Sequence, residues 1–258
     1  MAEASVPMAV PEVKQITRAD VTGALRAGLA DLQKAPMLSL FFGAVFSGVG
    51  IALALLLMQV GVGYWLLPLA AGFPLIGPFA AVGLYEISRR LEADEPLELR
   101  PILMAGFRSP HGQLPLFAVL AVFFLLAWLV LARVIFAVSF GTASMTNVMT
   151  SLEVFLTPSG MIMLVVGSVV GAALASLLFA ISVVGVPLLV DRDVDVVTAI
   201  ITSVRATLEN QGAMLYWGIF VAVATVIAML PLFLGMVLVF PVLGHASWHL
   251  YRALIPRE

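Results

Sequence analysis

Residues 161–190 read MIMLVVGSVVGAALASLLFAISVVGVPLLV and contain no charged side chain. A helix needs roughly 20 mostly apolar residues to cross the hydrocarbon core of a bilayer, at about 1.5 Å per residue. This stretch is longer than that requirement. It therefore predicts a membrane-spanning helix and points to an all-α membrane protein.

Other apolar stretches of this kind recur along the chain. Met37–Met58, Trp65–Tyr85 and Leu114–Ala137 each meet the length of one span. The block Met214–Tyr251 is too long for a single span, and Pro231 divides it into two pieces near the minimum length. We therefore expect an all-α polytopic bundle with about six transmembrane helices.

The composition agrees with a lipid environment. Of the 258 residues, 62% are hydrophobic and 11% are charged, and the mean hydropathy is +1.12. A soluble domain of this size could not bury so much apolar surface. The chain has no Cys, which excludes disulfides, thiolate metal sites and a Cys nucleophile. The formal net charge of -2 gives no indication of nucleic-acid binding.

The basic residues predict the orientation. With six spans, all of the 13 Lys and Arg except Arg133 fall on one side of the membrane. Because basic residues concentrate in cytoplasmic loops, we expect both termini in the cytoplasm and the chain in a bacterial inner membrane. Residues 1–36 have no long apolar stretch, so we expect no cleavable signal peptide and an uncleaved first span.

These predictions divide the chain into three segments: a cytoplasmic N-terminal segment (1–36), a single transmembrane domain (37–252) and a cytoplasmic tail (253–258). Two cytoplasmic stretches have apolar residues at helical spacing and should form amphipathic helices on the inner membrane surface. Asp195 is the expected N-cap of the second helix. The apolar positions are Val21, Leu25, Leu29 and Leu32 in the first stretch and Val197, Ile200, Ile201, Val204 and Leu208 in the second.

The chain has a candidate internal repeat of an amphipathic helix followed by a transmembrane hairpin. Asp20–Gly43 and Asp195–Gly218 share their spacing, and FPLIG at 73–77 matches FPVLG at 240–244. The sequence VPLL at 186–189 is a weaker counterpart in the fourth span. Three related units would account for six spans.

Prolines and small residues predict how the spans pack. A proline inside a helix removes one backbone hydrogen bond and favours a kink, as expected at Pro74, Pro78, Pro187 and Pro241. In the fourth span, small residues four apart form a ridge that lets helices approach closely. This ridge consists of Gly167, Gly171 and Ala175.

The spans carry no group typical of catalysis or ion coupling. No Asp, Glu or Lys falls near the middle of a span, which argues against ion-coupled transporters and proton pumps. Phosphate-binding loops, His-Glu-x-x-His motifs and Gly-x-Ser-x-Gly elbows are absent from the sequence. We therefore predict that the protein is not an enzyme and has no cofactor.

Four polar residues near the predicted inner ends of spans 2, 4 and 6 form a candidate site: Glu86, Asp191, His245 and His249. The two His residues are four apart and share one helix face. Because the four positions have similar predicted depths, we expect them to converge on one cytoplasm-facing cluster. Two His ligands without a third are a weak metal signal. Polar packing and a haem or metal site therefore both stay open.

Arg133 and Glu153 are the two opposite charges assigned to the outer side. About 19 apolar residues precede Arg133 in its span, which is roughly 28 Å of helix. Its side chain should therefore reach the outer interface. We expect either that it extends to the headgroups without a partner, or that it pairs with Glu153 and holds the loop between spans 3 and 4.

The sequence GFPLIGP at 72–78, followed by GLYEISRR at 83–90, resembles a family of predicted bacterial inner-membrane proteins catalogued only as a domain of unknown function. The other blocks of similarity are residues 189–194 with 199–205, and residues 241–252. The resemblance runs from about Ile16 to Arg252. It implies a shared surface at the cytoplasmic ends of spans 2, 4 and 6, and it implies no activity or ligand.

The leading hypothesis is a non-catalytic membrane protein that binds or helps assemble another membrane component. One alternative is a permease or channel for a small neutral or lipid-like substrate. Another is a haem- or metal-binding membrane protein that uses His245 and His249. The expected partners are membrane lipids, with another membrane protein as a further candidate, and nucleic acid is not expected.

Overall fold

The computed structural model describes residues 11–107, 113–141 and 152–257, and the regular elements within them are all helical. By length and composition, five helical stretches in these ranges are long and apolar enough to cross a membrane. The chain is therefore a multi-pass integral membrane protein, and the predicted all-α bundle is confirmed. The five stretches are Pro36–Gln59, Gly63–Glu92, Gln113–Phe140, Pro158–Asp191 and Gln211–Met229.

Three of these stretches are single helices, α2 (Pro36–Gln59), α7 (Gln113–Phe140) and α11 (Gln211–Met229). Each of them forms one helix because no proline interrupts the middle of its apolar run. Pro36 occupies the first turn of α2, where no backbone hydrogen bond is lost. Large apolar side chains on α7 and α11 remain exposed, as expected for surfaces that face lipid.

The second and fourth stretches are broken near the prolines that predicted kinks. In the second, a 3₁₀ helix separates two α-helical parts at Pro74. In the fourth, α8 (Pro158–Ser182) ends before α9 (Gly185–Asp191). The break frees the Val184 N–H, which donates to the Ser203 hydroxyl at 3.1 Å. The parts of the second stretch are η1 (Gly63–Trp65), α3 (Leu66–Gly72), η2 (Phe73–Ile76), α4 (Gly77–Ala80) and α5 (Val82–Glu92).

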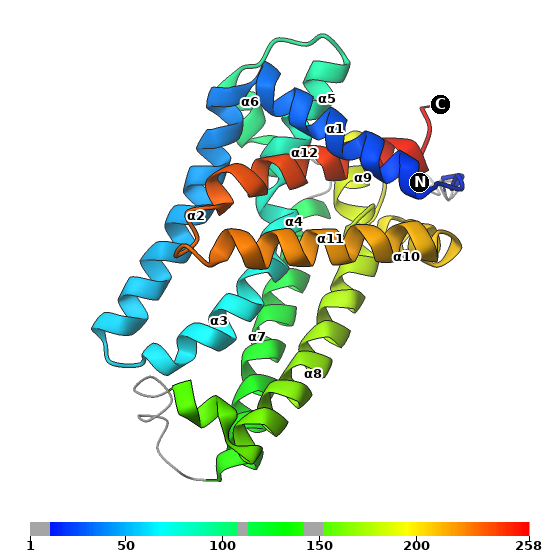
Figure 1. Ribbon diagram of the computed structural model, residues 1–258. Coiled ribbons are helices and arrows are strands. Elements are labelled where there is room, and N and C mark those ends of the chain that lie inside the picture. The colour runs from blue at the N-terminus through cyan, green and yellow to red at the C-terminus, as the bar shows by residue number, and fades with distance from the viewer. Residues whose placement is uncertain (1–10, 108–112, 142–151, 258) are drawn as a thin grey trace, which may run out of the picture.

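The last apolar block is divided at Pro231, as predicted: α11 ends at Met229 and α12 runs from Met236 to Leu254. Pro241 stays inside the continuous α12. This helix lies among α1, α2, α5, α9 and α11 (Figure 1), and Leu238 is its one exposed large apolar side chain. The polar residues of α12 therefore contact protein and not lipid. A helix in this position can carry more polar residues than a lipid-facing span, and for this reason α12 does not have the composition of a span.

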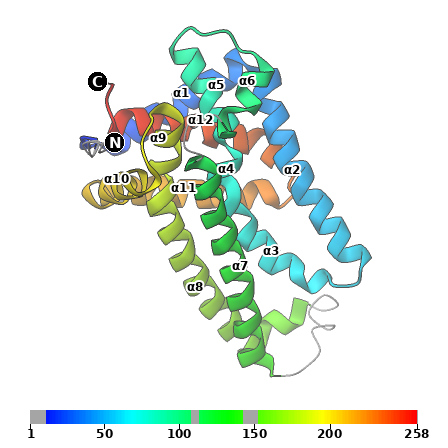
Figure 2. The ribbon, with the colours of Figure 1, turned by 180° about the vertical axis from the view of Figure 1, so that it is seen from behind.

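The helices have two main directions. In both views α7 and α8 descend side by side, whereas α11 and α12 run across them (Figures 1 and 2). The two ends of the described chain lie together beside α1 (Arg18–Lys34), α9 and α12 (Figure 1). The remaining short helices are α6 (Leu99–Leu103), η3 (Ala105–Phe107) and η5 (Leu152–Leu156).

Both predicted amphipathic helices form, and each starts at a capping residue. Thr17 and Asp20 make a capping box at α1, and Asp195 accepts the Thr198 N–H at 2.9 Å at the start of α10 (Val196–Glu209). Small and polar side chains of α10 face the protein, whereas its larger apolar residues Val197 and Leu208 are exposed. This apolar face is thus available to lipid.

The helix α1 packs differently from the prediction. Its buried face is Val21, Ala24, Gly28 and Asp31, and it lies along α12. Of the apolar face predicted to lie on the membrane surface, Leu29 is exposed, whereas Val21 is buried inside the protein. A residue as small as Gly28 is needed because a Cβ there would stand 2.5 Å from the Ala246 backbone nitrogen. Close packing on α12 therefore determines which face is buried.

The first and last units of the candidate repeat share one detail. A single residue separates α1 from α2 and α10 from α11, namely Ala35 (φ −128°, ψ 55°) and Asn210 (φ −122°, ψ 36°). The two breaks lie at the same distance along the chain from Asp20 and Asp195. The same local geometry thus joins an amphipathic helix to a span in both units.

Candidate functional site

A buried polar network joins α1, α2, α5 and α12 near the junction of α1 and α2. Its members are Asp31, Ser39, Ser88, His245 and His249, and we call it the Asp31 network. All except His249 are buried. Ser88 donates its hydroxyl proton to Asp31 Oδ2 at 2.7 Å, and His249 Nε2 lies 2.7 Å from the same oxygen. Charged and polar groups taken out of water need such partners to avoid a large loss of hydration energy.

The hydrogen bonds define the tautomer of neutral His245. Since Ser88 donates to Asp31, it can only accept from His245 Nδ1, which lies 2.7 Å away. The proton of the neutral ring is then on Nδ1, and Nε2 accepts from the Ser39 hydroxyl at 2.8 Å. The ring is therefore satisfied on both nitrogens while it carries no charge.

Ser39 also allows a second arrangement. Its hydroxyl lies 2.8 Å from the carbonyl oxygen of Ala35, which already accepts the Ser39 N–H at 3.0 Å. If the hydroxyl turns to Ala35, Nε2 must itself donate, and His245 would be doubly protonated. One hydroxyl rotation thus lets the network accommodate either charge state of His245.

Asp31 is held in its charged form. Burial alone would raise the pKa of this carboxyl group. The hydrogen bonds from His249 and Ser88, together with the charges of His249 and His245, outweigh burial and lower the pKa below its ordinary value. Asp31 therefore supplies a negative charge at the centre of contacts between four helices.

The structure brings the two His residues together but gives Glu86 and Asp191 other partners. Glu86 is buried and accepts hydrogen bonds from Arg89 Nε at 2.8 Å and Arg90 Nε at 2.7 Å. Both contacts lie within α5. The four residues predicted to converge are therefore divided among separate networks, although their helices α5, α9 and α12 do pack together.

Asp191 fastens the end of α9 to α12. Its Oδ2 accepts from the Tyr251 hydroxyl at 2.6 Å and from Arg252 Nη1 at 2.9 Å. Glu92 makes a parallel link from α5, since it accepts from Trp248 Nε1 at 3.1 Å. These contacts are structural ties. In the described ranges, no three His, Asp or Glu side chains group as metal ligands.

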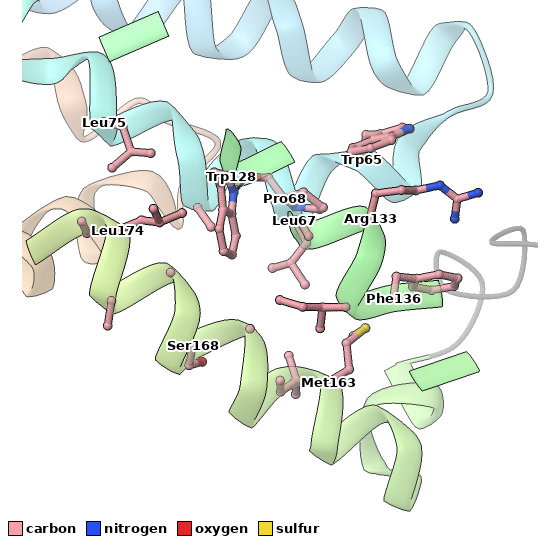
Figure 3. A pocket seen from close by; sticks show the side chains of 18 of the residues that line it. Trp65, Leu67, Pro68, Leu75, Trp128, Arg133, Phe136, Met163, Ser168 and Leu174 are labelled. Carbon is pink, nitrogen blue, oxygen red and sulfur yellow. Dashed lines mark hydrogen bonds between the residues drawn. The ribbon is translucent and has the colours of Figure 1, made fainter. Parts of the chain in front are cut away.

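A pocket of about 610 Å³ lies between α3, α7, α8 and α11, away from the Asp31 network (Figure 3). Ligand pockets commonly have volumes of about 300–1,000 Å³. The wall is almost entirely apolar, and Ser168 and Arg133 are among its few polar side chains. The other labelled residues of Figure 3 that line it are Trp65, Leu67, Pro68, Leu75, Trp128, Phe136, Met163 and Leu174.

Trp128 forms a fixed wall of the pocket. Its Nε1 donates to the Pro68 carbonyl oxygen at 2.7 Å, which ties α7 to α3. Its ring fills the space beside two glycines, because a Cβ at Gly72 would lie 2.6 Å from the ring and one at Gly171 3.1 Å from it. The indole therefore has a defined position between α3 and α8.

The small-residue ridge of α8 faces this pocket. Gly167, Gly171 and Ala175 all line it. At Gly171 the ridge does permit close packing, against Trp128. At Gly167, by contrast, no atom lies within 4 Å of where a Cβ would stand. The ridge thus leaves open space at one end instead of closing a helix interface along its whole length.

Arg133 lies at one end of the pocket, beside Trp65, while Leu75 and Leu174 lie at the other end (Figure 3). Its side chain is exposed. Glu153 belongs to η5, whose Phe155 lines the same pocket. The structure shows no ion pair between the described residues Arg133 and Glu153, and their pairing stays a prediction.

Sequence reasoning missed two parts of these sites. Asp31 lies in the first stretch predicted to form an interfacial helix. Nothing in the residues next to it indicates a contact with His249, which is 218 positions away. A buried face made of Ala24, Gly28 and Asp31 does repeat at helical spacing, and this small-residue pattern is the signal that could have been used. The pocket had no signal beyond the α8 ridge, because it depends on how four helices are spaced.

The comparison with protein families agrees with the resemblance found in the sequence. Residues 66–191 match the model of a family described as "Predicted integral membrane protein (DUF2189)". The match begins with α3 and ends with α9, so it includes the block at 72–90 and most of the pocket wall. No curated protein and no solved structure matches the chain.

Proposed function

We propose that this chain, which carries the DUF2189 match over residues 66–191, is a non-catalytic membrane protein that binds a lipid-like membrane component in the pocket between α3, α7, α8 and α11. The observation that carries the proposal is an apolar space of about 610 Å³ among candidate membrane spans. Apolar walls offer little to a hydrated solute but match the chains of a lipid.

The lining residues favour binding over chemistry. Among the described residues of the wall, the hydroxyl groups are those of Ser168 and Tyr64, and none of these residues is a His or a carboxylate that could act as a base. Without a base, neither hydroxyl has the partner that activates a nucleophile. The pocket therefore supports retention of a molecule more than its conversion.

The orientation belongs to the same proposal. The pocket lies at the end of α7 that carries Arg133, whereas the other basic residues are assigned to the opposite membrane face. With basic loops in the cytoplasm of a bacterial cell, the pocket would open at the level of the outer leaflet of the inner membrane.

The test is a substitution that fills the pocket. Gly167→Leu would place a side chain in open space, so it should occupy the pocket without displacing a neighbour. Gly48→Leu is the matched control, because Gly48 of α2 is exposed, also has no atom near its Cβ position and does not line the pocket. Both replace glycine by leucine in an apolar helix.

Each protein would be purified in mild detergent, and bound lipids would be counted by native mass spectrometry and identified after extraction. We expect a retained lipid with the unsubstituted protein and with Gly48→Leu, and its loss with Gly167→Leu at unchanged thermal stability. Equal retention by all three proteins, or retention by none, would overturn the proposal. A membrane-transport role would appear as faster movement of lipid between the two leaflets of vesicles that contain the unsubstituted protein.

A further inference from the structure

We propose that the molecule in the pocket is an anionic amphiphile whose headgroup binds Arg133 and whose acyl chain extends along α8 toward Leu75 and Leu174 (Figure 3). The proposal rests on the proposed lipid-binding function and specifies the class and direction of the ligand. The supporting observation is that one end of the pocket carries the positive charge of Arg133, whereas the other end is apolar.

The charge of Arg133 is available at the pocket end. Among the described parts of the chain, no hydrogen bond or ion pair engages its guanidinium group, and the side chain is exposed. Of the described residues that line the pocket, Arg133 is also the only charged one. A guanidinium presents five donors in a planar fork that matches the oxygens of a phosphate or carboxylate. An anionic headgroup is therefore attracted, and none of the described wall residues is a carboxylate that would repel it.

The position of Arg133 also suits a headgroup. Arg133 lies toward the C-terminal end of α7, and Tyr64 and Trp65 of η1 line the same pocket. Aromatic rings with one polar edge favour the boundary between hydrocarbon and headgroups. The charged end of the pocket thus corresponds to the depth at which lipid headgroups lie.

The wall along α8 suits an extended chain. Gly167, Gly171 and Ala175 are each four residues apart and line the pocket, so they form one groove about 12 Å long at 1.5 Å per residue. The groove leads away from Arg133 toward Leu174. Because its members lack large side chains, an acyl chain can lie against the α8 backbone.

This arrangement discriminates among amphiphiles by charge. A cationic headgroup would be repelled by Arg133, and a neutral molecule would leave the guanidinium without a counter-charge. A phospholipid with an anionic phosphate and a fatty acid with a carboxylate share the required chemistry. They differ in the number of chains and in headgroup size, which an experiment can separate.

The test compares three probes with the full-length protein in detergent: phosphatidylglycerol, phosphatidylcholine with the same acyl chains, and oleate. Binding would be measured by native mass spectrometry as a function of lipid concentration. We expect phosphatidylglycerol, oleate or both to bind at least about tenfold more tightly than phosphatidylcholine, which corresponds to about 1.4 kcal/mol. Preference for one anionic probe identifies the headgroup, whereas no preference over phosphatidylcholine overturns the proposal.

Substitutions separate this inference from the proposed function. Arg133→Gln should remove the preference for anionic probes while phosphatidylcholine still binds, and Arg133→Lys should retain part of it. Arg26→Gln on α1, which removes an exposed positive charge far from the pocket, should have no effect. If Arg133→Gln keeps the preference, the headgroup assignment is wrong. If Gly167→Leu binds every probe like the unsubstituted protein, the pocket itself is not the lipid site.

Discussion

The Asp31 carboxylate on α1 lies 2.7 Å from Nε2 of His249 on α12, although 218 positions separate the two residues. The contact joins the first described helix to the last one. Ser88 donates to the same carboxylate oxygen, so one acidic group holds α1, α5 and α12 together. The sequence of α1 predicts a helix on the membrane surface, but these contacts make α1 part of the helical bundle.

Acidification should weaken this junction. The pKa of Asp31 is lower in the folded protein than in the unfolded chain, where a carboxyl of this type has a pKa of about 3.9. The carboxylate therefore stabilises the fold above about pH 4, and this contribution is lost as the pH falls through the folded-state pKa. We expect the Tm in detergent to fall below pH 4.

Asp31→Asn should lower the stability at pH 7 by about 1.5–3 kcal/mol, the size of a hydrogen bond to a charged group. Its Tm should also depend less on pH below 4 than that of the unsubstituted protein. Asp20→Asn is a useful control, because Asp20 also has a lowered pKa but caps α1 at an exposed position. A Tm that is unchanged at pH 7 in Asp31→Asn would contradict the assigned role.

The two serines of the Asp31 network should differ in their contributions. Ser88→Ala removes one of the two partners of Asp31 and the partner of His245 Nδ1, whereas Ser39→Ala removes only the donor to His245 Nε2. A buried group left without a partner costs about 1–3 kcal/mol. Thermal unfolding should therefore show a larger loss of Tm for Ser88→Ala. The reverse order would mean that the hydroxyl directions are assigned incorrectly.

Two glycines of α2 should respond oppositely to alanine. A Cβ at Gly43 would lie 2.2 Å from the Val237 carbonyl oxygen of α12, so Gly43→Ala forces the helices apart and should cost about 1–3 kcal/mol. Gly48 has open space around it, so Gly48→Ala should be neutral or should stabilise by about 0.5–1 kcal/mol. Thermal unfolding of both variants in the same detergent gives the comparison, and equal effects would exclude close packing at Gly43.

The number of spans can be tested by topology reporters. With six spans, fusions after Gln59 and Thr157 should read outside, and a fusion after Arg257 should read inside. The last fusion decides the role of α12, which is 19 residues long but is not among the five stretches with the composition of a span. An outside reading after Arg257 would limit the chain to five spans.

Sequence reasoning predicted the helical class because long apolar runs such as Met161–Val190 leave few alternatives in lipid. It also placed the division at Pro231 and the cap at Asp195, since these depend on residues close together in the chain. The break before α9 was expected as a kink at Pro187. Local chemistry was sufficient for these features.

The partners of polar residues were harder to predict. Glu86 could reach Arg89 and Arg90 one turn away, yet equal depth suggested a contact with the distant His residues instead. The predicted depth of a residue in the membrane gives only its position along the membrane normal. The rotation of each helix about its own axis decides which side chains meet. Asp31 and His249 illustrate this, because the sequence gives no information on the rotation of α1 against α12.

The packing of α1 against α12 sets the order in which the protein can be completed. The ribosome makes α1 before α12, and the Lys14 N–H, which precedes α1, donates to the Leu254 carbonyl oxygen at the end of α12 at 2.8 Å. Gly28 and Asp31 have no α12 to pack against while the rest of the chain is being inserted. The helix α1 therefore cannot complete its contacts until α12 has been synthesised. A chain cut short before α12 leaves α1 without the helix on which it packs.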